Sequence, residues 1–123
     1  MAEHSFTVRN GRVEVHSGDQ LEWAGQVLGV VALDAFSLPG TTDGIVVLDW
    51  MDLPEGVESW HSFHNLVRIR SDGNTVWQAE LPDAEPSFVQ AKWDEGVLFA
   101  SAWSHCCKVD PETGQILETT FTK

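Results

Sequence analysis

The residues best suited to chemistry are two histidines, His61 and His64, three positions apart in a polar and aromatic segment. On a helical turn the two imidazoles would share a face and could bind one metal ion, whereas on a strand they would point to opposite faces. Together with His105 and a neighbouring cysteine they would form a set suited to zinc or another divalent metal. One hypothesis is therefore a metal-binding protein or metal-dependent enzyme that uses His61, His64 and His105. The alternative is loop histidines hydrogen-bonded to carbonyl or carboxylate groups.

The second reactive segment contains Cys106 and Cys107 directly after His105. On a strand, His105 and Cys107 share a face and Cys106 faces the other way, so no base is aimed at an adjacent thiolate. We expect one cysteine in the core and the other partly exposed, because a disulfide between adjacent residues is strained. The chain also lacks a Gly-x-Ser-x-Gly elbow, a phosphate-binding glycine loop and a dinucleotide fingerprint. The sequence therefore favours a protein that binds rather than catalyses, without a cofactor.

Acidic residues dominate the charge of the chain and are unevenly distributed. The 123 residues include 19 Asp and Glu against 7 Lys and Arg, which gives a formal net charge of −12. No Lys or Arg occurs between Arg12 and Arg68. A field of this sign repels phosphates, so nucleic acid is excluded as a partner and a basic protein is favoured. The other interpretation is that surplus carboxylates only keep a small protein soluble.

Two tryptophans lie in or beside the most acidic part of this interval. An exposed aromatic side chain next to carboxylates is typical of a hot spot for a basic protein partner, although each ring could equally cover the end of a sheet. The leading hypothesis is a non-catalytic protein-interaction module, such as an immunity-type or inhibitor protein that masks a basic active site. Its predicted partner-binding residues are Asp43, Asp49, Trp50, Asp52, Glu55, Glu58 and Trp60.

Composition limits the class of protein further. Hydrophobic residues make up 42% and charged residues 21% of the chain, an ordinary globular mixture. No apolar run approaches the roughly 20 residues of a membrane span, and the N-terminus lacks the pattern of a signal peptide. Two cysteines cannot form a disulfide framework. We therefore expect one domain over residues 1–123 in the cytoplasm, with no membrane contact.

Alternating apolar and polar residues predict β-structure along the whole chain. Asn10-Gly11 between two alternating segments predicts a type I′ hairpin, because both residues accept positive φ. Continuous apolar runs over 27–33 and 45–48 predict strands buried on both faces. The alternation also directs Trp77, Trp93 and Trp103 inward. The prediction is all-β, with about nine antiparallel strands in hairpins that form a small sandwich, an open barrel or blade-like sheets.

A strand, an acidic glycine-containing turn and a second strand recur over 15–23, 69–77 and 109–117. The segments IRSDGNTVW and VDPETGQIL resemble the outer-strand turn of quinoprotein-type β-propeller blades, and small uncharacterised bacterial proteins have similar blade-like ends. The resemblance implies blade-like sheets, and enzymes of that family bind a quinone at the axis of a closed ring. This chain holds at most three blade equivalents and matches no quinone- or metal-binding motif, so it implies no functional residues. A homodimer that pairs exposed sheet edges, as a purely structural homo-oligomer, is the alternative to a monomer.

Overall fold

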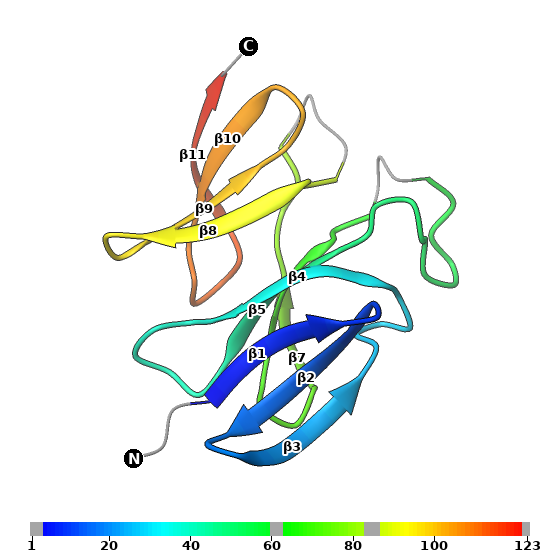
Figure 1. Cartoon of the computed structure of the whole chain (residues 1–123). Coiled ribbons are helices and arrows are strands. Elements are labelled where there is room, and N and C mark those ends of the chain that lie inside the picture. The colour runs from blue at the N-terminus through cyan, green and yellow to red at the C-terminus, as the bar shows by residue number, and fades with distance from the viewer. Residues whose placement is uncertain (1–3, 60–62, 83–86, 122–123) are drawn as a thin grey trace.

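The computed structural model describes residues 4–59, 63–82 and 87–121, and within these ranges the chain forms eleven β-strands and no helix (Figure 1). Every strand pairs with its neighbours in the antiparallel direction. The predicted all-β class is confirmed. The structure contains eleven strands in the described residues, two more than the roughly nine that were predicted.

The strands are arranged in three sheets, in each of which consecutive strands are hydrogen-bonded neighbours. The first sheet contains β1 (His4–Arg9), β2 (Arg12–Ser17) and β3 (Gln20–Gly25). The middle sheet contains β4 (Ala32–Ser37), β5 (Gly44–Leu48), β6 (Leu66–Ile69) and β7 (Thr75–Gln78). The third sheet contains β8 (Gln90–Asp94), β9 (Val97–Ser101), β10 (His105–Val109) and β11 (Ile116–Phe121).

The middle sheet is covered on both faces, so the three sheets form three layers (Figure 1). Val46 and Leu48 of β5 pack in a cluster with Val13 and Val15 of the first sheet. Ile45 and Val47, which alternate with them, pack in a second cluster with residues of the third sheet. All five residues of β5 are buried, which confirms the prediction that the apolar run 45–48 is covered on both sides.

The other apolar run, 27–33, is wrong as a single strand. Residues 27–30 form a turn that is closed by a 3.0 Å hydrogen bond from the amide of Val30 to the carbonyl of Val27. Leu28 and Gly29 have φ angles of 56° and 71°, so the chain reverses there and β4 begins only at Ala32. The Asn10-Gly11 prediction is confirmed, because these residues have φ angles of 52° and 75°.

The contact between the first and middle sheets depends on a glycine. A Cβ atom on Gly44 of β5 would overlap the ring of Phe6, which is buried in β1. We expect Gly44→Ala to lower the free energy of unfolding by about 2 kcal/mol, because the ring must leave its position. Gly56→Ala is the control, since a Cβ there meets nothing and only its φ of 87° costs about 1 kcal/mol. Urea unfolding of both variants measures this, and a smaller loss for Gly44→Ala would contradict the packing.

Candidate functional site

The structure separates Asp43 from the other predicted partner-binding residues. Asp43 directly precedes β5 and Asp49 directly follows it, so the two carboxylates lie at opposite ends of a buried strand. The carboxylate of Asp43 pairs with the guanidinium of Arg68, with Oδ2 at 2.9 Å from Nε and 2.8 Å from Nη2. Its charge is therefore compensated locally. Asp43 belongs to the junction between two sheets and not to an acidic surface.

The other predicted partner-binding acids, Asp49, Asp52, Glu55 and Glu58, lie on residues 49–59, here called the acidic loop. This loop projects from the stack of sheets (Figure 1). Two of its carboxylates fix the loop itself: Oδ1 of Asp49 accepts the amide of Met51, and Oδ2 of Asp52 accepts the amide of Val31. Glu55 and Glu58 are exposed. Trp60 lies outside the described residues.

The ring of Trp50 contacts the ring of Trp103, a residue between two strands of the third sheet. Trp50 and Met51 are the central residues of a turn that is closed by a bond from the amide of Asp52 to the carbonyl of Asp49. Trp103 is a central residue of the turn between β9 and β10, where the amide of Ala102 donates to the carbonyl of His105. The two indole rings make an edge-to-face contact, with centroids 6.1 Å apart and an angle of 80° between the rings. Trp50, Met51 and Trp103 are called the tryptophan corner below.

The tryptophan corner is open to solvent, which the sequence did not predict. Trp103 is 54% exposed and Met51 is 74% exposed. The prediction that Trp103 faces inward is wrong, because β9 ends at Ser101 and the alternation ends with it. Trp77 is buried as predicted, and Trp93 is half-buried against the core. Trp103 thus contributes to the surface rather than to the core.

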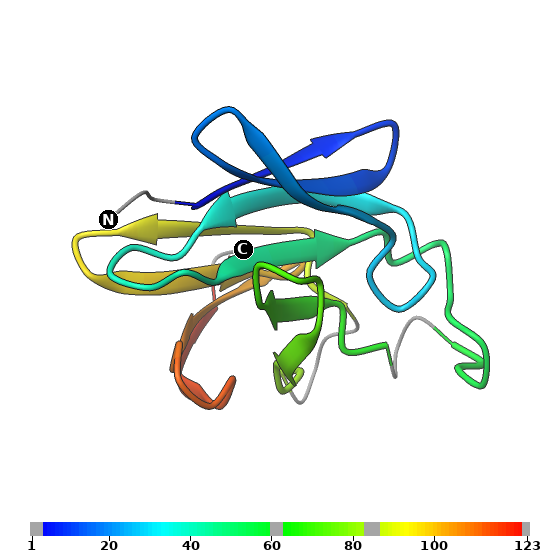
Figure 2. The same cartoon turned by 90° about the horizontal axis from the view of Figure 1, so that it is seen from below.

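A third turn lies beside the tryptophan corner. Val31, just after the turn 27–30, donates its amide to Asp52 and accepts the amide of Asp49 at 2.8 Å. The turn and the acidic loop therefore lie at the same end of the molecule, as Figure 2 shows. Leu28 at the tip of this turn is 40% exposed and has the φ of 56° that leucine rarely adopts. The surface thus combines apolar side chains from three turns.

The proposed metal ligands are not brought together by the described part of the chain. His61 lies outside it, and within it no three His, Cys, Asp or Glu residues are grouped so that they could hold a metal ion. The Nδ1–H group of His64 donates to the carbonyl of Ala79 at 2.8 Å, as expected of a loop histidine. Nδ1 of His105 lies 3.4 Å from the hydroxyl of Ser104.

The two cysteines behave as their places on a strand predict. Both are free thiols, and Cys107 is fully buried whereas Cys106 is half-buried. Sγ of Cys107 lies 3.7 Å from Oγ1 of Thr119 on the neighbouring strand. Cys107 packs in the core and Cys106 points to the opposite face of β10, which confirms the prediction of one buried and one partly exposed cysteine.

Arg68 is the residue at the junction of two sheets that sequence reasoning missed. Its Nη1 donates to the carbonyl of Pro111 at 2.7 Å, and the indole N–H of Trp77 donates to the same oxygen at 2.9 Å. This links β6 and β7 of the middle sheet to the turn between β10 and β11. The alternation of Arg68 with Val67 and Ile69 places its side chain on the other face of the strand, but it does not indicate which groups that side chain contacts.

A groove of about 440 Å³ lies beside this link, at the end of β5 opposite to the acidic loop. Its wall includes Trp93, Val76 and Pro39, with Arg68 and Glu112 as its charged residues. The ion pair of Arg68 with Asp43 leaves little of either side chain exposed, 14% and 15% respectively. The groove therefore lies between two sheets, and the ion pair of Arg68 with Asp43 beside it stabilises their packing rather than binding a ligand.

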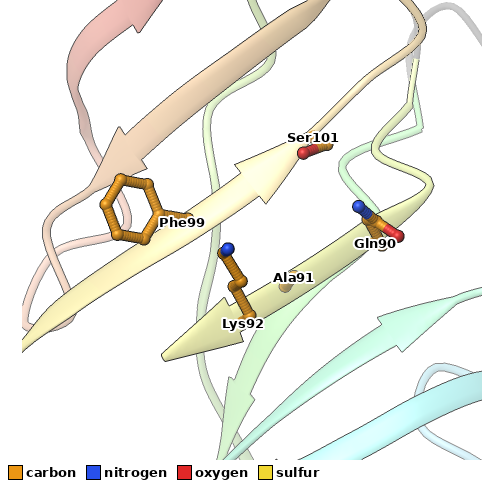
Figure 3. Close-up of a pocket in the computed structure, with 5 residues that line it drawn as sticks. All are labelled: Gln90, Ala91, Lys92, Phe99 and Ser101. Atoms are coloured by element: carbon orange, nitrogen blue, oxygen red, sulfur yellow. The ribbon is translucent and has the colours of Figure 1, made fainter. Parts of the chain in front are cut away.

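A smaller hollow of about 130 Å³ lies on the outer face of the third sheet (Figure 3). Figure 3 shows Lys92 on β8 beside Phe99 on β9, and the Lys92 Nζ atom lies 5.8 Å from the centre of the ring. Lys108 on β10 also pairs with Phe99 across the sheet and forms an ion pair with Glu118. This face is polar and typical of a sheet surface in contact with water.

Fold and surface together define a class: an all-β protein of three stacked antiparallel sheets with one exposed aromatic corner beside an acidic loop. The chain belongs to the family described as a domain of unknown function (DUF7957), whose model matches residues 9–121, from the end of β1 to the end of β11. No curated protein matches the chain. None of the described residues form a helix long and apolar enough to cross a membrane.

Proposed function

We propose that the protein is a non-catalytic interaction module that binds a basic protein through the tryptophan corner and the acidic loop. The observation that carries the proposal is the contact of the half-buried Trp50 with the exposed Trp103, beside a loop whose charged side chains are all negative. Aromatic residues at the centre of a patch and charges at its rim are the arrangement of protein-binding hot spots.

The tryptophan corner and the acidic loop are also ordered by hydrogen bonds within the chain itself. Backbone hydrogen bonds close the turns that carry Trp50 and Trp103, and Asp49 and Asp52 each use a carboxylate oxygen to fix the acidic loop. A surface ordered in advance loses less conformational entropy on binding. The exposed Glu55 and Glu58 supply long-range attraction to a basic surface, which acts mainly on the rate of association.

The finer parts of the proposal concern the kind of partner and the compartment. A toxic enzyme with a basic active site is a partner that such a surface would mask, which would make the protein an immunity-type or inhibitor protein. A reducing cytoplasm suits the two free thiols, Cys106 and Cys107. The polar outer face of the third sheet favours a monomer over a stack that continues into a second copy. Two four-stranded sheets of consecutive strands, packed face to face, support the resemblance to propeller blades.

The charge of the acidic loop can be tested without touching the residues that fix it. We expect Glu55→Lys with Glu58→Lys to slow association with the basic partner on the order of tenfold at low salt, and less at high salt. Proteins retained by the immobilised wild-type chain provide the partner, which is then purified for stopped-flow measurements of the association rate at several salt concentrations.

The matched control is Glu95→Lys with Glu112→Lys, which changes the net charge equally at the opposite end of the sheets, where both side chains are exposed. This control should leave the association rate within about a factor of two of the wild-type value. Equal slowing by both double variants would show that only net charge matters and would contradict a site at the acidic loop.

A further inference from the structure

The edge-to-face contact leaves aromatic surface available in the tryptophan corner. In such a pair, one ring places its edge on the face of the other, so the ring that gives its edge has both faces clear of its partner. Trp103 remains 54% exposed with the contact in place. A cation over an indole face is attracted by the negative potential of the ring. The corner therefore offers a surface on which a cationic group can stack.

The chain does not supply that cation from the segments that form the corner. Neither the acidic loop nor residues 102–107 contain Lys or Arg. The cation–ring contact that the structure does show, Lys92 with Phe99, lies on the outer face of the third sheet. These two segments therefore place no Lys or Arg side chain of their own on the rings.

Two carboxylates are held by backbone amides in the turn that carries Trp50. Asp49 and Asp52 flank Trp50 and Met51 in the same turn, and each uses one carboxylate oxygen for a backbone amide. Within the described part of the chain, the second oxygen of each carboxylate accepts no hydrogen bond from another residue. An oxygen that is held in place by its neighbour's bond is ready to accept an N–H group from a partner.

Resting on the proposed function, we infer that the tryptophan corner receives an arginine side chain of the basic partner. The planar guanidinium stacks on an indole face and donates N–H groups to the carboxylate of Asp49 or Asp52. Lysine satisfies only part of this arrangement, because its ammonium is a strongly hydrated point charge without a flat face. An anionic side chain would be repelled by the carboxylates of Asp49 and Asp52. A purely apolar side chain would offer these carboxylates no hydrogen-bond donor.

The test uses a short acetylated and amidated Gly-Arg-Gly peptide, with otherwise identical lysine and citrulline peptides as probes. Citrulline keeps the shape of arginine and removes its charge. The readout is the set of indole N–H signals in two-dimensional NMR spectra, assigned by single Trp→Phe variants. We expect the arginine peptide to shift the Trp50 and Trp103 signals with saturation in the millimolar range. The lysine peptide should need about a fivefold higher concentration, and citrulline should give no shift.

Two variants locate the binding. Trp103→Leu keeps an apolar side chain but removes the ring, so the shift of the Trp50 signal by the arginine peptide should be lost. Leu117→Ala removes exposed apolar surface on β11, outside the tryptophan corner, and should keep it. No response to arginine, an equal response to citrulline, or equal shifts at all six indoles would overturn the inference.

The outcomes also separate this inference from the proposed function. If the charge variants of the acidic loop slow partner association while the arginine peptide leaves Trp50 and Trp103 unmoved, the module binds its partner without the arginine contact. If the peptide binds at the corner and the charge variants leave the association rate unchanged, the arginine site is supported. The same result contradicts a role of the acidic loop in partner binding.

Discussion

Asn65→Leu is expected to lower the free energy of unfolding by about 4 kcal/mol, the largest effect of any single change considered. The side chain of Asn65 is fully buried. Its amide nitrogen donates to the carbonyls of Leu48 and Phe88, and its Oδ1 atom accepts the amide of Phe88, all within 2.8 Å. Leucine has a similar volume but leaves these three backbone groups buried without partners, at about 1–3 kcal/mol each.

The Asn65 network joins two layers, since Leu48 ends β5 of the middle sheet and Phe88 leads into β8 of the third. Because a domain of this size is stable by only about 5–15 kcal/mol, the variant should be close to unfolding in mild denaturant. Urea titration followed by tryptophan fluorescence measures the loss. Asn74→Leu makes the same chemical change at an exposed turn and should cost less than about 1 kcal/mol. Similar losses at both positions would contradict the role of the buried amide.

Arg68→Met is expected to lower the free energy of unfolding by about 3 kcal/mol. Methionine can fill much of the same space, but the variant leaves the largely buried carboxylate of Asp43 without its counter-ion. It also removes one of the two donors to the carbonyl of Pro111, so that Trp77 alone holds this oxygen. An uncompensated charge out of water is the larger of the two costs.

The control for this change is Arg70→Met on the same segment, because Arg70 is exposed and the variant should be nearly neutral. Asp43→Asn in the Arg68→Met background should recover part of the loss, since it removes the unpaired charge. Thermal and urea unfolding of the wild type, Arg68→Met, Asp43→Asn and the double variant gives the coupling energy between the two side chains. Additive losses would show that the side chains of Asp43 and Arg68 do not stabilise each other, which would contradict the role of the ion pair.

Local patterns in the sequence predicted the strands well and the third layer poorly. Asn10-Gly11 and the run 45–48 gave the correct turn and the correct burial, because positive φ and two-sided covering leave marks in adjacent residues. The turn 27–30 was missed because Leu28 adopts a positive φ that only its folded surroundings impose. The role of Arg68 between the sheets was not predicted, because no local pattern in the sequence indicates that Asp43 and Pro111 are its partners.

The candidate site was predictable in part for the same reason. The charge of the acidic loop and the place of Trp50 within it are local, and both were predicted. The contribution of Trp103 was not, because it depends on β9 ending at Ser101 and on two segments 53 positions apart meeting at one end of the stack. Alternation along a strand cannot show where a strand ends. Asp43 was wrongly grouped with the loop because five buried residues of β5 separate them in space.

The tryptophan corner takes one ring from the loop after β5 and the other from the turn after β9, so it exists only while the middle and third layers are docked. A partner that binds the tryptophan corner therefore binds the conformation in which the third sheet is packed on the middle sheet. It does not bind partly unfolded forms in which these two sheets have separated. By mass action, a partner at one hundred times its dissociation constant adds about 2.7 kcal/mol to the stability of that form. The lifetime of the protein against proteolysis would then depend on whether its partner is present, so that the free and bound populations are removed from the cell at different rates.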